Sequence, residues 1–217
     1  MEKRTRSYAG EALEVTYDLK RCIHAAECVR GLPAVFDSQR RPWVQPDAAD
    51  ANAVARTIER CPSGALHYAR HDGGANEAPA AEASIVPQLD GPLYLRGDIA
   101  LRAPDGTLLA HETRVALCRC GQSANKPFCD GSHHQAAFHD PGAIGEKTLR
   151  PAEPGVPATL VVTPTENGPI EVLGAFSICD ASGETCKDGG RAYLCRCGAS
   201  ANKPFCDGTH SKIGFRG

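Results

Sequence analysis

Apolar and polar residues alternate along residues 13–17, and this two-residue period predicts a β-strand near the start of the chain. Farther along, residues 47–60 place apolar side chains three and four positions apart, which predicts an amphipathic helix. Asp47 follows a proline and is expected to cap the start of this helix, and Cys61-Pro62 is expected to end it. The apolar face of the helix comprises Ala51, Val54, Ala55 and Ile58.

The second half of the chain has a pattern of short strands and turns. Apolar segments at residues 93–95 and 170–173 predict brief strands, and Asp105-Gly106 and Ser182-Gly183 predict hairpin turns. Between this region and the first one, residues 71–83 are rich in glycine, alanine and proline. That composition predicts a linker.

An internal repeat accounts for the layout of the second half. Residues 91–138 align without a gap on residues 168–215, at a constant offset of 77 positions. The agreement is strongest over residues 117–133, where only two of 17 positions differ from residues 194–210. This high identity indicates a chemical constraint on the loop, although a recent duplication would produce the same identity.

Composition and charge exclude several classes of function. The chain has 217 residues, enough for one or two domains with a core. Its formal net charge of −2 argues against a nucleic-acid partner or an acidic membrane surface. No apolar run is long enough to cross a membrane, and no signal-peptide pattern follows the basic N-terminal residues. We therefore expect a cytoplasmic protein.

Cysteine changes the picture most. The chain has 11 cysteines, an odd number, and most of them fall into three groups with short spacings. Without a secretory signal, clustered cysteines and histidines point to metal binding rather than to disulfides. The alternative, that these cysteines are small buried apolar side chains, does not explain why Cys-x-Cys occurs twice.

The repeated loop offers four metal ligands within 16 residues. Its pattern is Cys-x-Cys-x8-Cys-x3-His, formed by Cys118, Cys120, Cys129 and His133 and repeated by Cys195, Cys197, Cys206 and His210. Two cysteines on an extended segment can bind one iron, and a Cys and a His four apart share one face of a helical turn. A tetrahedral zinc site accepts the same ligand set, so zinc remains an alternative.

Two further pairs of residues accompany the repeated ligands. Asp130 and Asp207 are expected to cap short helices through the backbone N–H groups that follow them. Arg119 and Arg196 lie between the paired cysteines. They either donate hydrogen bonds near the metal or lie in solvent on the loop.

The repeated loop resembles the CDGSH iron–sulfur family, also called NEET proteins. The resemblance rests on Cys-Asp-Gly-Ser-His at residues 129–133, Cys-Asp-Gly-Thr-His at 206–210, and the preceding Asn-Lys-Pro-Phe in both copies. It implies one [2Fe-2S] cluster per loop, with Cys118 and Cys120 on one iron and Cys129 and His133 on the outer iron. Many members of the family are homodimers with one motif per chain. Two motifs in one chain therefore imply an intramolecular pseudo-dimer, and hence a monomer.

The third cysteine group lies in the first part of the chain. Cys22 and Cys28 occupy the first and third positions of Cys-x2-Cys-x2-Cys, Ala25 stands at the second, and Cys61 precedes a proline. This part resembles a divergent mono-cluster ferredoxin domain. Three cysteines suffice for a [3Fe-4S] cluster, whereas a [4Fe-4S] cluster needs a fourth ligand. His24 is the candidate, either as a ligand or as a neighbour that tunes the cluster. The alternative is a ferredoxin-like fold that has lost its cluster.

Cys179 and Cys186 have no cysteine counterparts in the first repeat, where Arg102 and Leu109 occupy their positions. They flank a predicted turn and can face each other across a hairpin. We expect free thiols in a reducing cytosol, with a redox-active pair as the alternative.

Together these features predict an α+β protein. A small ferredoxin-like domain covers residues 1–70, and a linker covers 71–83. A β-rich tandem CDGSH domain with pseudo-two-fold symmetry follows, with repeats at 84–140 and 141–217.

The first functional hypothesis is one-electron transfer between a reductase and an acceptor protein. The second is an iron–sulfur cluster carrier or a redox or iron sensor, whose His-bound clusters pass to apo-proteins or are lost. The third is a zinc-stabilised binding module. We do not expect an enzyme, because the sequence offers no Ser-His-Asp set, no Gly-rich phosphate loop and no open metal position beside an acid or base.

Overall fold

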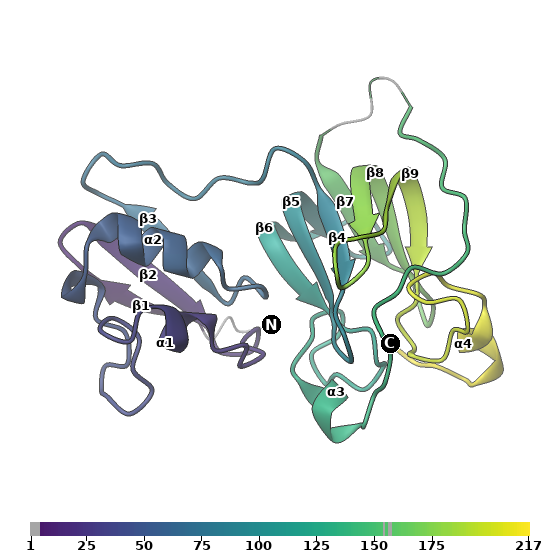
Figure 1. The fold of residues 1–217 in the computed structure, drawn as a ribbon, viewed down its shortest axis with the longest axis horizontal. Coiled ribbons are helices and arrows are strands. Elements are labelled where there is room, and N and C mark those ends of the chain that lie inside the picture. The colour runs from purple at the N-terminus through teal and green to yellow at the C-terminus, as the bar shows by residue number, and fades with distance from the viewer. Residues whose placement is uncertain (1–4, 154, 156–157) are drawn as a thin grey trace. The chain divides into compact units, whose positions relative to one another are not determined.

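The computed structural model describes residues 5–153, 155 and 158–217, and these fall into two compact units, within residues 1–78 and 79–217 (Figure 1). The fold is mostly β with few and short helices, so the predicted α+β class is correct only in part. The first unit contains β1 (Thr5–Ala9), β2 (Leu13–Asp18), α1 (Glu27–Gly31), a 3-10 turn (Pro46–Ala48), α2 (Ala51–Glu59) and β3 (Leu66–Arg70). The second contains β4 (Ser84–Pro87), β5 (Leu93–Arg102), β6 (Leu108–Leu117), α3 (Ser132–Gln135), β7 (Leu160–Pro164), β8 (Ile170–Cys179), β9 (Cys186–Leu194) and α4 (Thr209–Lys212).

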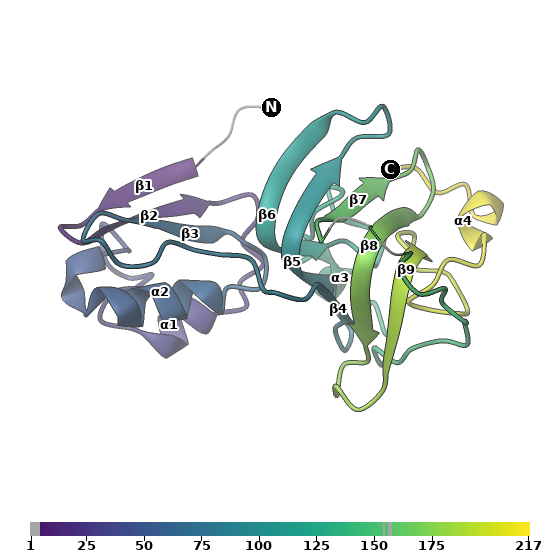
Figure 2. The same ribbon diagram turned by 90° about the horizontal axis from the view of Figure 1, so that it is seen from above.

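The first unit is a three-stranded antiparallel sheet in the order β1-β2-β3, with α1 and α2 on one side of it (Figure 2). The strand predicted at residues 13–17 is confirmed as β2, in which buried and partly buried residues alternate. Leu13 and Val15 of β2 and Ile58 of α2 are buried in the same apolar cluster. Burial of these side chains holds the helix against the sheet.

Helix α2 starts later than the sequence predicts, so the assignment of Asp47 as its cap is wrong. The chain first makes a 3-10 turn over Pro46–Ala48, and the Asp47 carboxylate accepts the backbone N–H of Glu11 at 2.8 Å. Asp50 is the cap, because its carboxylate accepts the N–H groups of Asn52 and Ala53 at 3.0 and 3.2 Å. Helix N-termini leave such N–H groups without partners in the helix, which Asp satisfies well.

We expect Asp50→Ala to lower the free energy of unfolding of this unit by about 1 kcal/mol, since the capping hydrogen bonds are lost. Asp50→Asn is the matched control, because asparagine caps helices about as well as aspartate. Urea denaturation followed by circular dichroism measures both. Equal losses for the two variants would contradict the capping role.

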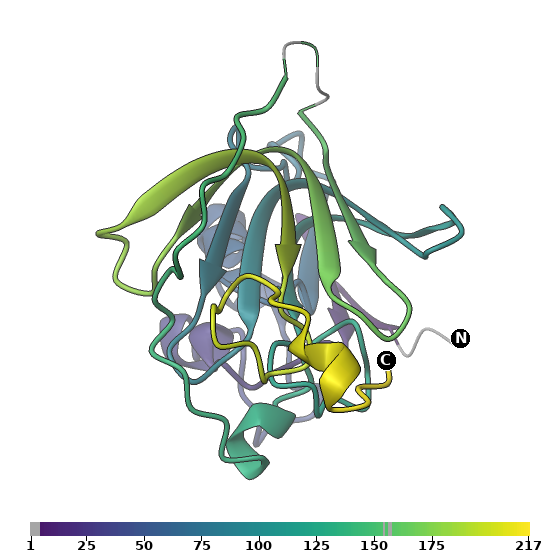
Figure 3. The same ribbon diagram turned by 90° about the vertical axis from the view of Figure 1, so that its right-hand side faces the viewer.

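The second unit is a β-rich region that forms a small mixed barrel (Figure 3). Each repeat contributes a short strand and a long hairpin: β4 with β5–β6, and β7 with β8–β9. The predicted segments at residues 93–95 and 170–173 are the starts of β5 and β8, which each extend over 10 residues. The buried apolar side chains of both repeats form one core, which includes Ile85, Leu93, Leu95, Ile99, Leu101, Leu160, Val162, Ile170, Val172, Phe176, Ile178, Leu194 and Phe205.

Each short strand pairs with both repeats. Strand β4 pairs antiparallel with β5 of its own repeat and parallel with β8 of the other. Strand β7 pairs antiparallel with β8 and parallel with β5. The ring β4-β5-β7-β8 is thereby closed, and neither repeat completes it alone. Both short helices, α3 and α4, lie at the same end of this unit (Figures 1 and 3).

Candidate metal centres

The first cysteine loop folds back on the end of β6. The backbone N–H of Cys118 donates to the carbonyl oxygen of Pro127 at 2.8 Å, and that of Cys129 donates to Ala116 at 2.9 Å. These bonds bring Cys129 beside the pair Cys118 and Cys120, whose sulfur atoms are 3.8 Å apart. All three cysteines are buried. The predicted grouping of thiols therefore arises from a short backbone hairpin.

Helix α3 supplies the fourth predicted ligand of this loop. The Nδ1 atom of His133 lies 3.4 Å from the sulfur of Cys129, and the N–H of Gly131 points to the same sulfur at 3.4 Å. Burial, and secondly the neighbouring His134 ring, lower the pKa of His133. The neutral imidazole is the form that binds metals. The environment of His133 therefore favours its ligating form.

The second loop repeats this backbone arrangement. The N–H of Cys195 donates to Pro204 at 2.7 Å, and that of Cys206 donates to Tyr193 at 2.8 Å. The sulfur atoms of Cys195 and Cys197 are again 3.8 Å apart. His210 differs from His133, because its Nδ1 atom lies 3.1 Å from the carbonyl oxygen of Asn167. Here the cysteines are grouped as predicted, while the histidine ring has a backbone partner.

The pKa values of two thiols in the first loop are shifted in opposite directions. A hydrogen bond from the Cys120 thiol lowers the pKa of Cys118 to about 6, whereas burial raises the pKa of Cys129 to about 11. Iron and zinc bind thiolates, so metal binding must displace the proton of Cys129. Backbone N–H groups directed at sulfur, from Gly131 and from Gln122 at 3.5 Å to Cys120, favour the anionic form.

The two loops contact each other directly. Cys120 and Cys197 form an isolated antiparallel bridge between their backbones. The following glycines make this approach possible: a Cβ atom on Gly121 would lie 2.7 Å from the carbonyl oxygen of Cys197, and one on Gly198 would lie 2.7 Å from that of Cys120. The predicted ligand sets of the two repeats therefore meet, each through its second cysteine.

Both predicted arginines are buried, so the alternative that they lie in solvent is wrong. Arg119 donates through Nε to the carbonyl oxygen of Gly91 at 2.9 Å and forms an ion pair with Asp140. Arg196 donates to the carbonyl oxygens of Gly168 at 2.9 Å, Thr165 at 2.6 Å and Gly217 at 2.9 Å. Each arginine thus joins the first residue of its aligned repeat, Gly91 or Gly168, to the segment between the paired cysteines.

The two predicted aspartates accept backbone N–H groups but do not occupy the capping position. Gly131 and Gly208, both with positive φ, stand at the helix starts. Asp130 accepts the N–H groups of Ser132 at 3.0 Å and Ala124 at 2.8 Å. Asp207 does the same in the second loop, and bonds from the hydroxyl and the N–H of Thr209 lower its pKa. The aspartates therefore join the helix to the preceding part of the loop.

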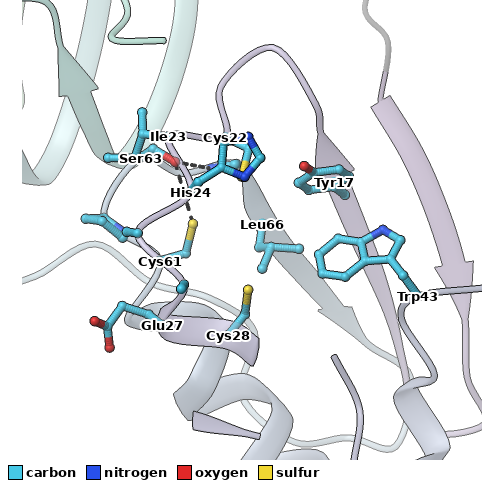
Figure 4. Close-up of a pocket in the computed structure, with 14 residues that line it drawn as sticks. Tyr17, Cys22, Ile23, His24, Glu27, Cys28, Trp43, Cys61, Ser63 and Leu66 are labelled. Atoms are coloured by element: carbon cyan, nitrogen blue, oxygen red, sulfur yellow. Dashed lines mark hydrogen bonds between the residues drawn. The ribbon is translucent and has the colours of Figure 1, made fainter. Parts of the chain in front are cut away.

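The first unit brings together the third predicted ligand group. Cys22, Cys28 and Cys61 line one cavity, and His24 lines it with them (Figure 4). Burial, and secondly the nearby Cys61 thiol, raise the pKa of Cys28 to about 11. His24 has a φ of 56°, a left-handed backbone conformation that is uncommon for histidine. Backbone strain of this kind concentrates at functional sites.

Sequence reasoning missed the aromatic wall of this cavity. Tyr17 and Trp43 line it, with ring centroids 4.8 Å apart. Burial, and secondly a hydrogen bond with Cys22, raise the pKa of Tyr17. The alternation of residues 13–17 predicts that Tyr17 faces the core, but nothing near Trp43 in the sequence links it to cysteines. Both rings form an aromatic wall of the cavity that the three thiols line.

The three groups of predicted ligands have side chains of the kind that bind iron–sulfur clusters. Each group offers three thiols, and N–H groups are directed at sulfur in both CDGSH loops, where the N–H of Gly208 lies 3.4 Å from Cys206. Across the described residues, no three His, Cys, Asp or Glu side chains lie close enough together to hold one metal ion. Cluster ligands are divided among several irons joined by sulfide.

Cys179 and Cys186 form a disulfide, so the expectation of free thiols is wrong. They are register partners at the end of the β8–β9 hairpin, as the position of the turn allowed.

Within residues 5–153, 155 and 158–217, each helix is too short or too polar to cross a lipid bilayer.

Comparison with known families agrees with this arrangement. Residues 8–71 match the family described as divergent 4Fe-4S mono-cluster, and residues 90–134 and 167–211 match the iron-binding zinc finger of CDGSH type. The chain is also similar to the uncharacterized protein YjdI of Escherichia coli strain K12 and of O157:H7. Each is 44% identical over 66 residues, which are 30% of this chain and 86% of the E. coli protein.

The grouped thiols and these matches define a chain built of iron–sulfur-binding domains, of kinds typical of non-catalytic cluster-binding proteins. More particularly, its first unit belongs to the divergent 4Fe-4S mono-cluster family, and two CDGSH iron-binding domains follow that unit. The resemblance to these two families, drawn from the signature residues, is confirmed.

Proposed function

We propose that the chain is a one-electron transfer protein that holds a [2Fe-2S] cluster in each CDGSH loop and a third cluster in its first unit. When bound, such clusters supply one-electron couples. The chain's own contribution is to hold them, to exclude water and to set their potentials. We assign Cys118, Cys120, Cys129 and His133 to the first loop, Cys195, Cys197, Cys206 and His210 to the second, and Cys22, Cys28 and Cys61, with His24, to the first unit.

The observation that carries this proposal is the backbone bridge between Cys120 and Cys197. It joins one assigned ligand of each CDGSH loop, so the two clusters would be held in a single frame with pseudo-two-fold symmetry. Such a frame suits a relay between a reductase and an acceptor protein. Because both loops come from one chain, the protein would act as a monomer.

The two CDGSH loops differ in exposure, and this favours a second candidate function. Cys129 and His133 are 3% and 6% exposed, whereas Cys206 and His210 are half-buried. A cluster in the second loop would therefore be the more accessible one. Access suits contact with a redox partner, and it also suits delivery of a cluster to an apo-protein or its loss as a signal.

Anaerobic purification with iron, zinc and sulfide analysis tests the cofactors. We expect about four irons from the two loops and about three or four from the first unit, with visible absorption that bleaches reversibly on reduction. Reversible reduction without iron loss supports electron transfer. If iron and sulfide are transferred to an apo-ferredoxin faster than they are released into solution, the carrier function is supported. A colourless, zinc-containing protein would overturn both.

His24 is expected to bind the iron that the three cysteines leave without a protein ligand. His24→Ala should lower the iron content by about one per chain, and it should produce a [3Fe-4S] EPR signal in the oxidised protein. His71→Ala is the control, since His71 does not line the cavity. Unchanged iron content and EPR spectra in His24→Ala would contradict the assignment.

His133→Cys should retain the cluster and lower its reduction potential, on the order of 100 mV, because a thiolate replaces a neutral imidazole. It should also slow the acid-induced loss of that cluster, because protonated imidazole cannot bind iron. Protein-film voltammetry and the pH dependence of visible absorption measure these effects, with His134→Asn as the control. An unchanged pH profile after replacement of both His133 and His210 would refute the ligand assignment.

A further inference from the structure

Two cysteines at the end of the β8–β9 hairpin take no part in the three metal sites. Cys179 ends β8 and Cys186 begins β9, their Cα atoms are 4.1 Å apart, and a disulfide joins them. This separation is close to that of directly opposed residues in a non-hydrogen-bonded antiparallel pair, about 4.5 Å. The strand register itself therefore brings the two sulfur atoms together.

The hairpin turn does not depend on the disulfide. Asp180 donates its N–H to the carbonyl oxygen of Thr185 at 2.9 Å, and its carboxylate accepts the N–H groups of Ser182, Glu184 and Thr185 at 3.1–3.2 Å. The cross-link closes a loop with a sequence separation of only seven residues. Short loops gain least from cross-linking. Stabilisation is therefore a weak reason for two cysteines here.

The pair is accessible, and the other cysteines are not available for the same chemistry. Cys186 is exposed and Cys179 is half-buried. All eleven cysteines lie in the described part of the chain, and the nine free ones are those of the three metal sites. When the three metal sites hold their clusters, Cys179 and Cys186 therefore remain accessible to thiols from solution. Exposed disulfides are generally the labile, regulatory or catalytic ones.

We propose that Cys179 and Cys186 form a redox-active dithiol/disulfide site that reacts with thiols. A thiolate of the reductant attacks the sulfur of Cys186, the Cys179–Cys186 bond breaks, and Cys179 leaves as a thiolate that takes up a proton. A second thiol then attacks the mixed disulfide and releases Cys186, so two reductant thiols become one disulfide. Two electrons and two protons reach the protein. The reductant is either a small thiol such as glutathione or the dithiol of a thioredoxin-like protein.

Peptide mass spectrometry tests this on the cluster-loaded full chain. Trypsin cuts after Lys147 and Lys187 but not between Arg150 and Pro151, so one peptide holds both cysteines and no other. The protein is equilibrated either in glutathione buffers or with reduced thioredoxin, then alkylated. We expect the peptide to change from no alkyl label to two, and the arm in which this happens identifies the reductant. The site is overturned if the pair stays oxidised in both arms while the denatured chain is reduced, or if glutathione disulfide never oxidises it.

Single variants test the same exchange in reverse, with glutathione disulfide as the oxidant. In Cys179→Ser the Cys186 thiolate should attack glutathione disulfide, form a mixed disulfide and release one glutathione thiolate. In Cys186→Ser the same reaction at Cys179 should be at least tenfold slower, because Cys179 is less exposed. Equal trapping rates would overturn the assigned order of attack. The unchanged iron content of both variants checks that they fold. This inference does not depend on the proposed electron transfer.

Discussion

Replacing Gly121 by alanine is expected to lower the free energy of unfolding of the CDGSH unit by about 2–5 kcal/mol. The residue has a φ of 80°, which costs an alanine about 1–2 kcal/mol. The added Cβ would also lie 2.7 Å from the carbonyl oxygen and 3.0 Å from the carbonyl carbon of Cys197. Both atoms belong to the backbone and cannot turn aside, so overpacking adds about 1–3 kcal/mol. The bridge between Cys120 and Cys197 should open, and the iron content should fall.

Gly106→Ala is the matched control for this prediction. Gly106 has a φ of 88° and nothing within 4 Å of its Cβ position. It should therefore show the backbone cost alone, with full iron content. Thermal denaturation followed by circular dichroism and visible absorption compares the two variants. Similar midpoints for Gly121→Ala and Gly106→Ala would show that the close approach of the two loops does not stabilise the unit.

Replacing Arg119 by methionine should destabilise the same unit by about 3–5 kcal/mol. The substitution leaves the carboxylate of Asp140, whose side chain is 8% exposed, without its arginine, and breaking a buried ion pair costs about this much. Lys203, whose ammonium group lies 3.6 Å from the same carboxylate, compensates only in part. The loss of the hydrogen bond to Gly91 adds to the effect.

Arg196→Met makes the comparison within one chain. Arg196 contacts backbone carbonyl oxygens, and the residue 77 positions after Asp140 is Gly217, which has no side-chain carboxylate. Its loss should cost about 1–3 kcal/mol, the range for buried polar groups left without partners. Urea denaturation of both variants gives the difference. If Arg196→Met is the more damaging variant, the ion pair is not what makes Arg119 important.

The sequence was sufficient to predict which thiols lie close together. Short cysteine spacings depend on local backbone geometry, and the structure places Cys118 beside Cys120, Cys195 beside Cys197, and the three cysteines of the first unit around one cavity. The start of α2 was predicted incorrectly because Asp47 and Asp50 are both good capping residues. Their choice depends on the tertiary hydrogen bond between Asp47 and Glu11, which the local pattern does not contain.

Long-range pairing explains most of what the sequence did not reveal. Asp140 lies outside residues 91–138, the part of the first repeat that aligns with the second, so its contacts with Arg119 and Lys203 have no local signal. The same holds for the parallel pairing of β4 with β8 and of β7 with β5, because strand patterns do not specify their partners. The disulfide was misjudged because the expectation rested on the cellular compartment, whereas the register of β8 and β9 decides which thiols meet.

The parallel pairing of each short strand with the other repeat also determines how the CDGSH unit responds to dilution. In a chain with one repeat, the short strand would have no parallel partner strand. A second copy of the chain would have to supply that strand, and the rate of this association depends on protein concentration. Covalent linkage turns that association into an intramolecular step with a high effective concentration. Assembly of the barrel is thus independent of how much of the protein is made. A chain cut between β6 and β7 would regain that dependence, and its halves would separate on dilution.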